Sequence, residues 1–392
     1  MSQSPPPKKR LAIFLDGTWN DVGDNTSVWR LRSLCAPIGS DQRDQLVYYD
    51  TGVGTQFGEK VRGGLYGYGI DEHVKKAYEW LVENYNDGDQ IFIFGFSRGA
   101  FTARSLAGLI SICGVLLPGT PLGVSQLYDR YRTIDRNKKS IRHLFDDQAK
   151  GTLSAPTREE RWVLHYSRNV EIEMLGVWDT VAAIDLPGLP KHNFLDPNLR
   201  HDMKNAFHAL AIDEHRHRFA PTLWTQSSPA ASGAPHISRD FTAVEQRWFI
   251  GAHANLGGGY PSDLLPQIPL QWLAGKAAGL GLTFREEVNV EARAHLDPIA
   301  DSYGSFFLGL YKRASKPYYR PIGSAPEERD GYLVATINET IDASVFERWR
   351  SDTNYRPQNL ADWARRRGVA IEDLHGAVRA DDPKAPLSRN VT

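Results

Sequence analysis

The sequence predicts an α/β protein with a mostly parallel central sheet and helices on both of its faces. Short, uncharged apolar runs recur along the chain, and such runs are typical of strands that are buried on both faces. Segments with helical periodicity lie between these runs. A repeated strand–helix order at this spacing favours parallel strands that are joined by crossover helices.

The first elements follow one another closely. Residues 11–16 (LAIFLD) predict a buried strand, and residues 46–50 (LVYYD) predict a second strand that runs into a glycine-rich segment. Residues 70–85 have helical periodicity, with acidic residues in the first turn, where the helix dipole favours them. Residues 91–94 (IFIF) predict the next strand, and a second helical pattern follows it directly.

The later elements are spaced more widely. Residues 170–180 (VEIEMLGVWDT) predict a buried strand, and residues 205–219 (NAFHALAIDEHRHRF) resemble a helix. Residues 246–260 predict a strand followed by a glycine-rich loop, and residues 269–282 predict a packing helix.

Composition excludes several classes of protein. The chain has 392 residues, of which 41% are hydrophobic and 24% charged, as in a soluble globular protein of one large or two modest domains. A formal net charge of −1 gives no electrostatic reason to expect a nucleic acid partner. The two cysteines, Cys35 and Cys113, exclude a disulfide framework. The apolar run at 105–117 is too short to span a membrane, so we expect no transmembrane segment.

A serine stands between two glycines where the strand at 91–94 ends. The pattern Gly95-Phe96-Ser97-Arg98-Gly99 fits a sharp strand-to-helix bend, which needs small neighbours and lifts the central hydroxyl clear of the sheet. The buried strand before it and the helical pattern after it agree with that context. Ser97 is therefore the predicted nucleophile, with Gly95 and Gly99 in supporting roles.

A nucleophilic serine needs a histidine base and an acid that orients this base. On a sheet of this kind both partners follow later strands, the acid before the histidine. Asp179 comes directly after the strand at 170–180, and His253 follows the strand that begins at 246. The order predicts a triad of Ser97, Asp179 and His253.

Other acids and histidines are rivals for these roles. Asp213 lies in a helical pattern, Asp185 lies beyond a strand end, and Asp263 follows the glycine-rich loop, which makes each of them more typical of a cap or a surface charge. Further histidines lie near the expected helix, and their spacing does not match a zinc motif, so no metal site is predicted: His201, His208, His215 and His217.

Acyl chemistry also needs donors for the developing oxyanion. The backbone N–H of Arg98, the residue after the nucleophile, is the first predicted donor. The loop LDGTWN after the first strand is expected to supply the second donor through Gly17 or Thr18. Asp16 is expected either to hold these donors in place or only to tie down the turn.

Seven motifs in this order resemble those of a known family: FLDGTWND, TGVGT, GGLYGYGI, GDQIFIFGFSRGAFTARSLAGLI, LGVWDTVA, HALAIDEHRHRFAPTLW and RWFIGAHANLGGGY. Over residues 10–285 the chain resembles an α/β-hydrolase family, long catalogued as a domain of unknown function, that includes type VI secretion phospholipase effectors. The resemblance implies an α/β-hydrolase fold and places Ser97, Asp179 and His253 on the family triad. The family pattern around the histidine is closer to G-V-H-S-D-V-G-G-G-Y, so Asn255 stands where the family has an acid.

These observations predict a domain organisation. A disordered tip at 1–9 precedes a catalytic domain at 10–285, and a C-terminal extension at 286–392 is expected to pack on or near it. Loosely patterned segments near 115–160 and 184–200 are rich in Pro and Gly and carry isolated apolar residues. We expect them to form a cap over Ser97 with an apolar acyl-binding pocket, since hydrolases of this architecture build their specificity there.

The predicted function is that of a serine ester hydrolase, whose substrate the resemblance suggests to be a lipid or phospholipid ester. No cofactor is predicted, because the glycines at 52–58 do not have the G-x-G-x-x-G spacing. The short apolar run at the N-terminus predicts a cytoplasmic protein without a cleavable signal, which is compatible with a signal-independent secretion route and with transient membrane-surface contact. The alternative is a hydrolase-fold binding or scaffold protein without turnover.

Overall fold

The computed structural model describes residues 8–17, 24–52, 68–133, 139–181, 199, 202–230, 239–260, 262–304, 312 and 315–387. Its strands are β1 (Arg10–Leu15), β2 (Gln45–Asp50), β3 (Gln90–Phe96), β4 (Val115–Leu116), β5 (Ser167–Arg168), β6 (Ile172–Trp178), β7 (Met203–Ala211), β8 (Thr225–Pro229), β9 (Val244–Phe249), β10 (Glu327–Arg329), β11 (Tyr332–Thr336), β12 (Glu339–Ile341) and β13 (Val378–Arg379).

The helices are α1 (Ser27–Leu34), α2 (Tyr68–Asn84), α3 (Arg98–Cys113), α4 (Val124–Arg132), α5 (Ile141–Ala149), α6 (Arg158–Tyr166), α7 (His253–Gly257), α8 (Gln267–Gly279), α10 (Ala343–Ser351) and α11 (Gln358–Arg367). Short 3₁₀ turns lie at His217–Phe219, Ala294–Leu296 and Ile371–Asp373.

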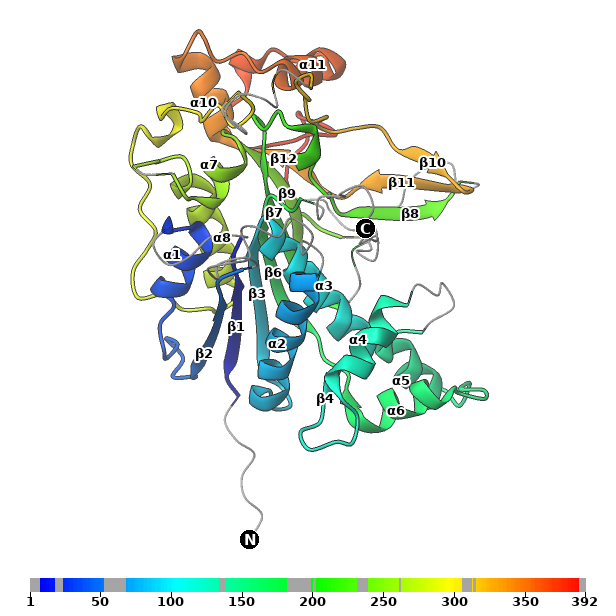
Figure 1. Ribbon diagram of the computed structural model, residues 1–392. Coiled ribbons are helices and arrows are strands. Elements are labelled where there is room, and N and C mark those ends of the chain that lie inside the picture. The colour runs from blue at the N-terminus through cyan, green and yellow to red at the C-terminus, as the bar shows by residue number, and fades with distance from the viewer. Residues whose placement is uncertain are drawn as a thin grey trace.

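The central sheet has eight strands in the described part of the chain, in the order β13-β12-β9-β7-β6-β3-β1-β2 (Figure 1). All neighbours from β12 to β2 pair in parallel, and β13 alone runs antiparallel to its neighbour. The predicted α/β class and the mostly parallel sheet are confirmed. Because the strands are parallel, their carboxyl ends meet at one edge of the sheet, where ligand sites of such folds lie.

Alternation along the strands explains why both faces of the sheet are covered. Leu11, Ile13 and Leu15 of β1 belong to an apolar cluster that also contains residues of α2 and α3. Ala12 and Phe14 of the same strand point to the other face, into a cluster with α1 and α8. Side chains on a strand alternate between its faces, so a run that is apolar at every position is buried on both.

The helix predicted at 205–219 is wrong, because the chain there forms the strand β7. Residues 203–211 pair in parallel with β6 on one side and β9 on the other. From Ala206 onward the strand is buried, and His208 lies within it. An apolar run that is covered on both faces shows no alternation, so its periodicity does not separate a strand from a helix.

The cap predicted near 115–160 does not lie over Ser97. α3 begins at the carboxyl edge of the sheet and runs antiparallel to β3, so it delivers the chain toward the opposite edge (Figure 1). There Arg168 bonds to the Tyr85 carbonyl and pairs with Asp87, and Arg142 pairs with Asp202. These partners precede β3 and β7. The prediction failed because it overlooked that a crossover helix reverses direction. The second cap segment, near 184–200, lies outside the described residues except for Leu199.

The C-terminal part of the chain contributes to the same sheet. β12 extends it next to β9, and β13 follows β12. α10 and α11 pack with these strands in an apolar cluster that contains Trp248, Phe346 and Trp363. The division at 285 into a catalytic domain and an extension stays a prediction, and the sheet continues across it. Residues 1–7 of the predicted disordered tip lie outside the described residues, whereas Lys9 pairs with Asp89 at 2.6 Å.

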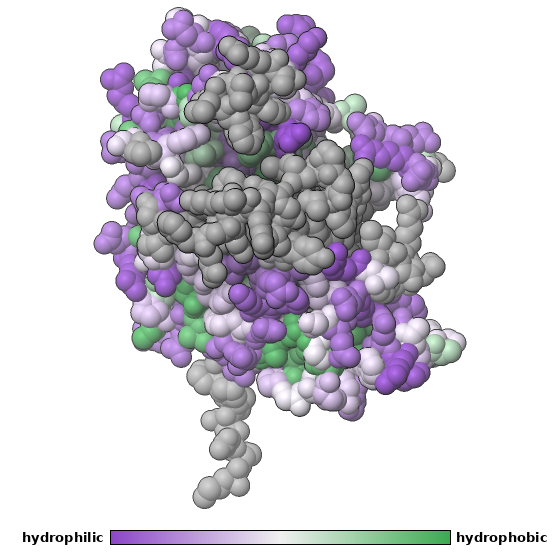
Figure 2. All heavy atoms as spheres, in the orientation of Figure 1, coloured by the Kyte–Doolittle hydropathy of each residue, from purple (hydrophilic) through white to green (hydrophobic). Residues whose placement is uncertain are grey.

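A second, three-stranded antiparallel sheet, in the order β10-β11-β8, projects from one side of the molecule (Figure 1). Its outer strand β10 is exposed and charged, and Figure 2 shows hydrophilic residues over this arm. Across the described residues, no helix combines the length and the apolar character needed to cross a membrane.

Candidate active site

Ser97 occupies a strained position between β3 and α3. Its φ of 58° and ψ of −121° lie in a region that residues with a side chain rarely adopt. The Ser97 N–H donates to the Trp178 carbonyl of β6 at 3.1 Å, which fixes the bend against the neighbouring strand. Such strain persists only where the surrounding structure enforces it, and it is concentrated at functional sites.

Both neighbouring glycines are required by close backbone contact. A Cβ on Gly95 would collide with the Gly99 carbonyl across the bend. A Cβ on Gly99 would collide with the carbonyls of Leu15 and Asp16, at the end of β1. The two glycines therefore let the bend close and let α3 approach the sheet, as the sequence pattern predicts.

Asp179 follows β6 at the same edge of the sheet. It is fully buried and has a φ of 42°, so its backbone is strained like that of Ser97. Its N–H donates to the Ala209 carbonyl at 2.8 Å, and its Oδ1 accepts from the Ala211 N–H at 3.1 Å. Both contacts are with β7, so the neighbouring strand holds the carboxylate in place.

His253 contacts both Ser97 and Asp179. It is the first residue of α7, after β9, and its Nδ1 lies 2.6 Å from Asp179 Oδ2, while its Nε2 lies 2.8 Å from Ser97 Oγ. The ring packs against Phe96 and Phe219, with centroid distances of 4.8 and 5.1 Å. The carboxylate can only accept, so Nδ1 carries the proton and leaves Nε2 as an acceptor for the serine hydroxyl when the imidazole is neutral.

A fourth residue, Arg320, contacts the carboxylate of Asp179. Its side chain is fully buried, and its two terminal nitrogens lie 2.6 and 2.9 Å from Asp179 Oδ1 and Oδ2. Burial by itself raises the pKa of Asp179, but the Arg320 charge and the His253 hydrogen bond outweigh burial and hold that pKa well below its ordinary value. Arg320 could not be predicted from the sequence, because PYYRPIGS contains no motif that marks it.

The rival acids lie elsewhere. Asp213 comes after β7 rather than in a helix, and its carboxylate accepts from the Gly251 N–H at 2.7 Å and from the Tyr355 hydroxyl at 3.2 Å. Asp263 accepts from Asn255 Nδ2 at 2.8 Å. Burial and the nearby Asp297 raise the pKa of Asp263 to about 6, against the hydrogen bond from Asn255. Asp185 lies outside the described residues.

The histidines on the predicted helix have other positions. His208 is buried in β7, where its Nε2 accepts from the Thr180 N–H at 3.0 Å. Burial, followed by the charge of Arg104, lowers the pKa of His208 to about 3, so this ring is neutral and supports the backbone next to Asp179. His215 and His217 follow β7 and pack edge-on against Tyr319 and Tyr318. Within the described ranges no cluster of three or more His, Cys, Asp or Glu could hold a metal ion.

The loop after β1 is organised by Asp16. This buried carboxylate accepts from the Gly17 N–H at 2.7 Å, the Thr26 hydroxyl at 2.5 Å and the Tyr49 hydroxyl at 2.9 Å. The Gly17 N–H predicted as an oxyanion donor is thus bonded to Asp16 here. Thr18, the alternative donor, lies outside the described residues. Arg98, the first residue of α3, follows Ser97 directly.

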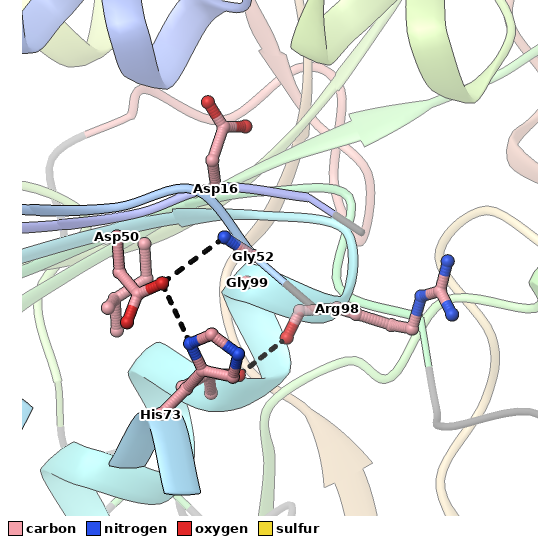
Figure 3. A pocket seen from close by; sticks show the side chains of 8 residues that line it. Asp16, Asp50, Gly52, His73, Arg98 and Gly99 are labelled. Atoms are coloured by element: carbon pink, nitrogen blue, oxygen red, sulfur yellow. Dashed lines mark hydrogen bonds and ion pairs between the residues drawn. The ribbon is translucent and has the colours of Figure 1, made fainter. Parts of the chain in front are cut away.

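A small pocket lies behind the bend, between α2, α3 and the end of β2. Figure 3 shows Asp50 between His73 and the Gly52 amide, with ion-pair and hydrogen-bond distances of 2.7 and 3.3 Å. The side chain of Arg98 extends away from these groups. Burial raises the pKa of Asp50, but the contact with His73 outweighs it and the pKa is lowered. This contact thus links α2 to the end of β2.

A parallel sheet with a strained serine after a central strand, an acid after the next strand and a histidine beyond them defines the α/β-hydrolase fold. Within that class, the family model for the catalytic domain of Tle1-like phospholipase effectors of the type VI secretion system matches residues 9–276. This range is more than half of the chain, so the protein belongs to that family, and the resemblance seen in its motifs is confirmed.

Individual relatives are more distant. An uncharacterized protein of Saccharomyces cerevisiae is 25% identical over 311 residues, which are 69% of this chain and 43% of that protein. The chain therefore spans less than half the length of this relative. An uncharacterized protein from Pseudomonas aeruginosa is similar in structure over 79% of this chain and 51% of its own, with 19% identity and a TM-score of 0.43.

Two further solved structures are similar at lower scores. One is a Tle1 effector bound to the VgrG spike of the type VI secretion system, with 19% identity over 65% of this chain and 52% of that chain and a TM-score of 0.35. The other is an esterase of Thermogutta terrifontis, with 12% identity over 72% of this chain and 85% of that chain and a TM-score of 0.34.

Proposed function

We propose that the protein is a serine hydrolase that cleaves carboxylic esters, and that its substrates are lipid or phospholipid esters. The observation that carries the proposal is the hydrogen-bonded chain from Asp179 through His253 to Ser97 Oγ, with distances of 2.6 and 2.8 Å. Such a chain activates a serine hydroxyl that is otherwise a weak nucleophile. The family supports the lipid substrate, since its model describes phospholipase effectors.

In the proposed reaction, Ser97 Oγ attacks the ester carbonyl carbon while His253 Nε2 takes the hydroxyl proton. Asp179 holds the ring and stabilises the imidazolium that forms. The Arg98 N–H, at the positive N-terminal end of α3, is the proposed donor to the oxyanion. His253 then gives its proton to the leaving alcohol. Water, activated by the same histidine, hydrolyses the acyl-enzyme and restores Ser97.

The choice between enzyme and non-catalytic binding protein is made by covalent labelling. The purified protein is treated with a fluorophosphonate probe, which reacts with an activated serine, and wild type is compared with Ser97→Ala. A panel of p-nitrophenyl esters and phospholipids is run on the same two proteins. Labelling and turnover that both depend on Ser97 would support the proposal. An unlabelled wild type without turnover would favour the binding or scaffold alternative.

The place of action is also a proposal. The family is named for effectors of the type VI secretion system, and we propose that this protein is exported by such a route and acts on lipid at a membrane surface. Detection of the protein in the medium of a strain with a working secretion system, but not of a strain without one, would test the export step.

A further inference from the structure

Building on the proposed function, we propose that Arg320 is a positioning residue of the active site, which holds the catalytic acid by both of its oxygens from the C-terminal part of the chain. Arg320 lies outside residues 9–276, the range that the family model matches. The inference therefore assigns a role in catalysis to a segment that the family match does not cover.

The contact between Arg320 and Asp179 is buried and involves both carboxylate oxygens. The guanidinium group of Arg320 is completely buried and forms a two-pronged contact with Asp179, at 2.6 and 2.9 Å. The nitrogen that bonds Asp179 Oδ1 also donates to the Ala211 carbonyl at 2.8 Å, and the other nitrogen donates to the Phe219 carbonyl. Planar, two-pronged contacts of this kind fix the orientation of a carboxylate as well as its charge.

The backbone around Arg320 is held just as firmly. Asn359 of α11 donates to the carbonyls of Arg320 and Ile212, at 3.2 and 3.0 Å, and so ties the segment to the end of β7. Further along, the Gly323 N–H donates to Glu339 of β12 at 3.0 Å. The C-terminal segment thus carries Arg320 to the carboxyl edge of the sheet and fixes it there.

The contact has a chemical consequence for the reaction. Asp179 must stay ionised to accept from His253 Nδ1–H, yet a buried carboxylate without a partner tends to protonate. Arg320 and His253 on α7 contact this carboxylate, and His208 on β7 interacts with it electrostatically. Arg104 on α3 acts on His208, and Glu214 after β7 acts on Arg320 and His253. The His208 ring is neutral at ordinary pH, and Glu214 pairs with Arg216 at 2.7 Å. Arg320 is therefore the permanent positive charge that contacts Asp179.

The test compares Arg320→Gln and Arg320→Lys with the matched variants Arg10→Gln and Arg10→Lys. Arg10 is also a buried arginine in a two-pronged pair, with Asp41 at 2.8 Å, but it begins β1 at the opposite edge of the sheet. The kcat and KM values for a p-nitrophenyl ester are measured from about pH 4 to about pH 9, the range over which a raised aspartate pKa would appear. Circular dichroism and thermal unfolding show whether each variant is folded.

For Arg320→Gln we expect kcat to fall about a hundredfold near neutral pH with KM unchanged, as for a misplaced catalytic group, because Arg320 is buried and does not meet the substrate. The acidic limb of its kcat–pH profile moves to higher pH, since Asp179 now protonates more easily. Arg320→Lys keeps the charge but loses the two-pronged hold, so kcat falls while the acid limb stays in place. If Arg320→Gln does not fold, the lysine variant decides the question.

Three results would overturn the inference. The first is an Arg320→Gln protein that is folded and has the kcat and pH profile of Arg10→Gln. The second is an Arg320→Lys protein with the wild-type kcat. The third is a folded wild type that neither hydrolyses any ester nor reacts with the fluorophosphonate, which would remove the proposed function and this role with it. If the wild type hydrolyses esters, the first two results overturn the role of Arg320 alone and leave the proposed function standing.

Discussion

The Nε2 atom of His253 lies 2.8 Å from the Oγ atom of Ser97, although 156 positions separate the two residues in the chain. In the sheet, β6 and β7 lie between β3, which precedes Ser97, and β9, which precedes His253. The turn after β9 therefore carries α7 back across the ends of these two strands. The contact forms only when the central strands are all in register, and it links the proposed chemistry to the integrity of the whole sheet.

Replacement of Ser97 by alanine is expected to reduce ester turnover by several orders of magnitude and to abolish fluorophosphonate labelling, because the proposed nucleophile is gone. The thermal unfolding midpoint should not fall, because alanine keeps the Cβ and the same strained backbone, and only the hydroxyl is lost. Ser33→Ala, at an exposed position on α1, is the control and should keep both activities. Turnover near the wild-type rate in Ser97→Ala would exclude this residue as nucleophile.

Asp179→Asn is expected to lower kcat by a factor on the order of 10⁴, because an amide in this place favours the wrong tautomer of His253. The asparagine also loses the ion pair with Arg320, so its unfolding midpoint is measured beside the rate. Asp213→Asn is the comparison, because the carboxylate of Asp213 bonds to Gly251 and Tyr355. A greater loss of kcat in Asp213→Asn than in Asp179→Asn would mean that the acid is assigned to the wrong residue.

Asp263 gives a prediction for the dependence of stability on pH. Its folded pKa of about 6 is above the ordinary value of 3.8, so the folded protein holds a proton that the unfolded chain releases. This carboxyl therefore costs stability increasingly as the pH rises from about 4 to about 6, and the cost is complete above that window.

Asp263→Asn should accordingly raise the unfolding midpoint at pH 7 relative to its effect at pH 4. The two oxygens of Asp263 accept from different donors, Oδ1 from the Leu265 N–H and Oδ2 from Asn255, so the single oxygen of asparagine keeps one of these bonds at either pH. Thermal unfolding at the two pH values measures the difference. An equal effect at both would show that the carboxyl has no raised pKa.

Gly99→Ala tests the close approach of α3 to the end of β1. The added Cβ would meet the carbonyls of Leu15 and Asp16, so the backbone must shift, at a cost of about 1 to 3 kcal/mol in the free energy of unfolding. The shift also displaces the Arg98 N–H, and kcat should fall with it.

The control for that substitution is Gly275→Ala. Gly275 lies on α8 with no atom near the position of an added Cβ, so alanine should stabilise the helix by roughly 0.5 to 1 kcal/mol through its higher helix propensity. Urea unfolding measures both variants. Equal stability of Gly99→Ala and wild type would mean that the bend has more room than the structure shows.

The parts of the fold that were predicted correctly are those with strong local patterns. The strands around residues 91 and 172 are short apolar runs, and the bend at Ser97 has a glycine on each side because the backbones touch. β7 was mistaken for a helix, since a strand covered by β6, β9 and both helical layers lacks alternation. The placement of the segment at 115–160 depended on the direction of α3, which no local pattern gives.

Arg320 marks the limit of what the sequence could show about the site. Ser97, Asp179 and His253 each follow a strand that can be recognised, so their meeting at one edge of the sheet could be predicted. No strand directly precedes Arg320 among the residues that the structure describes, and Arg320 reaches Asp179 because α11 and the end of β7 hold its backbone. A contact that depends on tertiary packing of this kind leaves no spacing in the sequence.

The pairing of β12 with β9 also matters for what happens when the C-terminal part is lost. β12 pairs with β9 on the side away from β7, and β13, a strand of two residues, pairs with β12 at the edge of the sheet. A chain cut after residue 285 would retain Ser97, Asp179 and His253 but would present the unpaired N–H and C=O groups of β9 to solvent. Such an exposed edge recruits strands of other molecules, so the shortened protein should self-associate and precipitate.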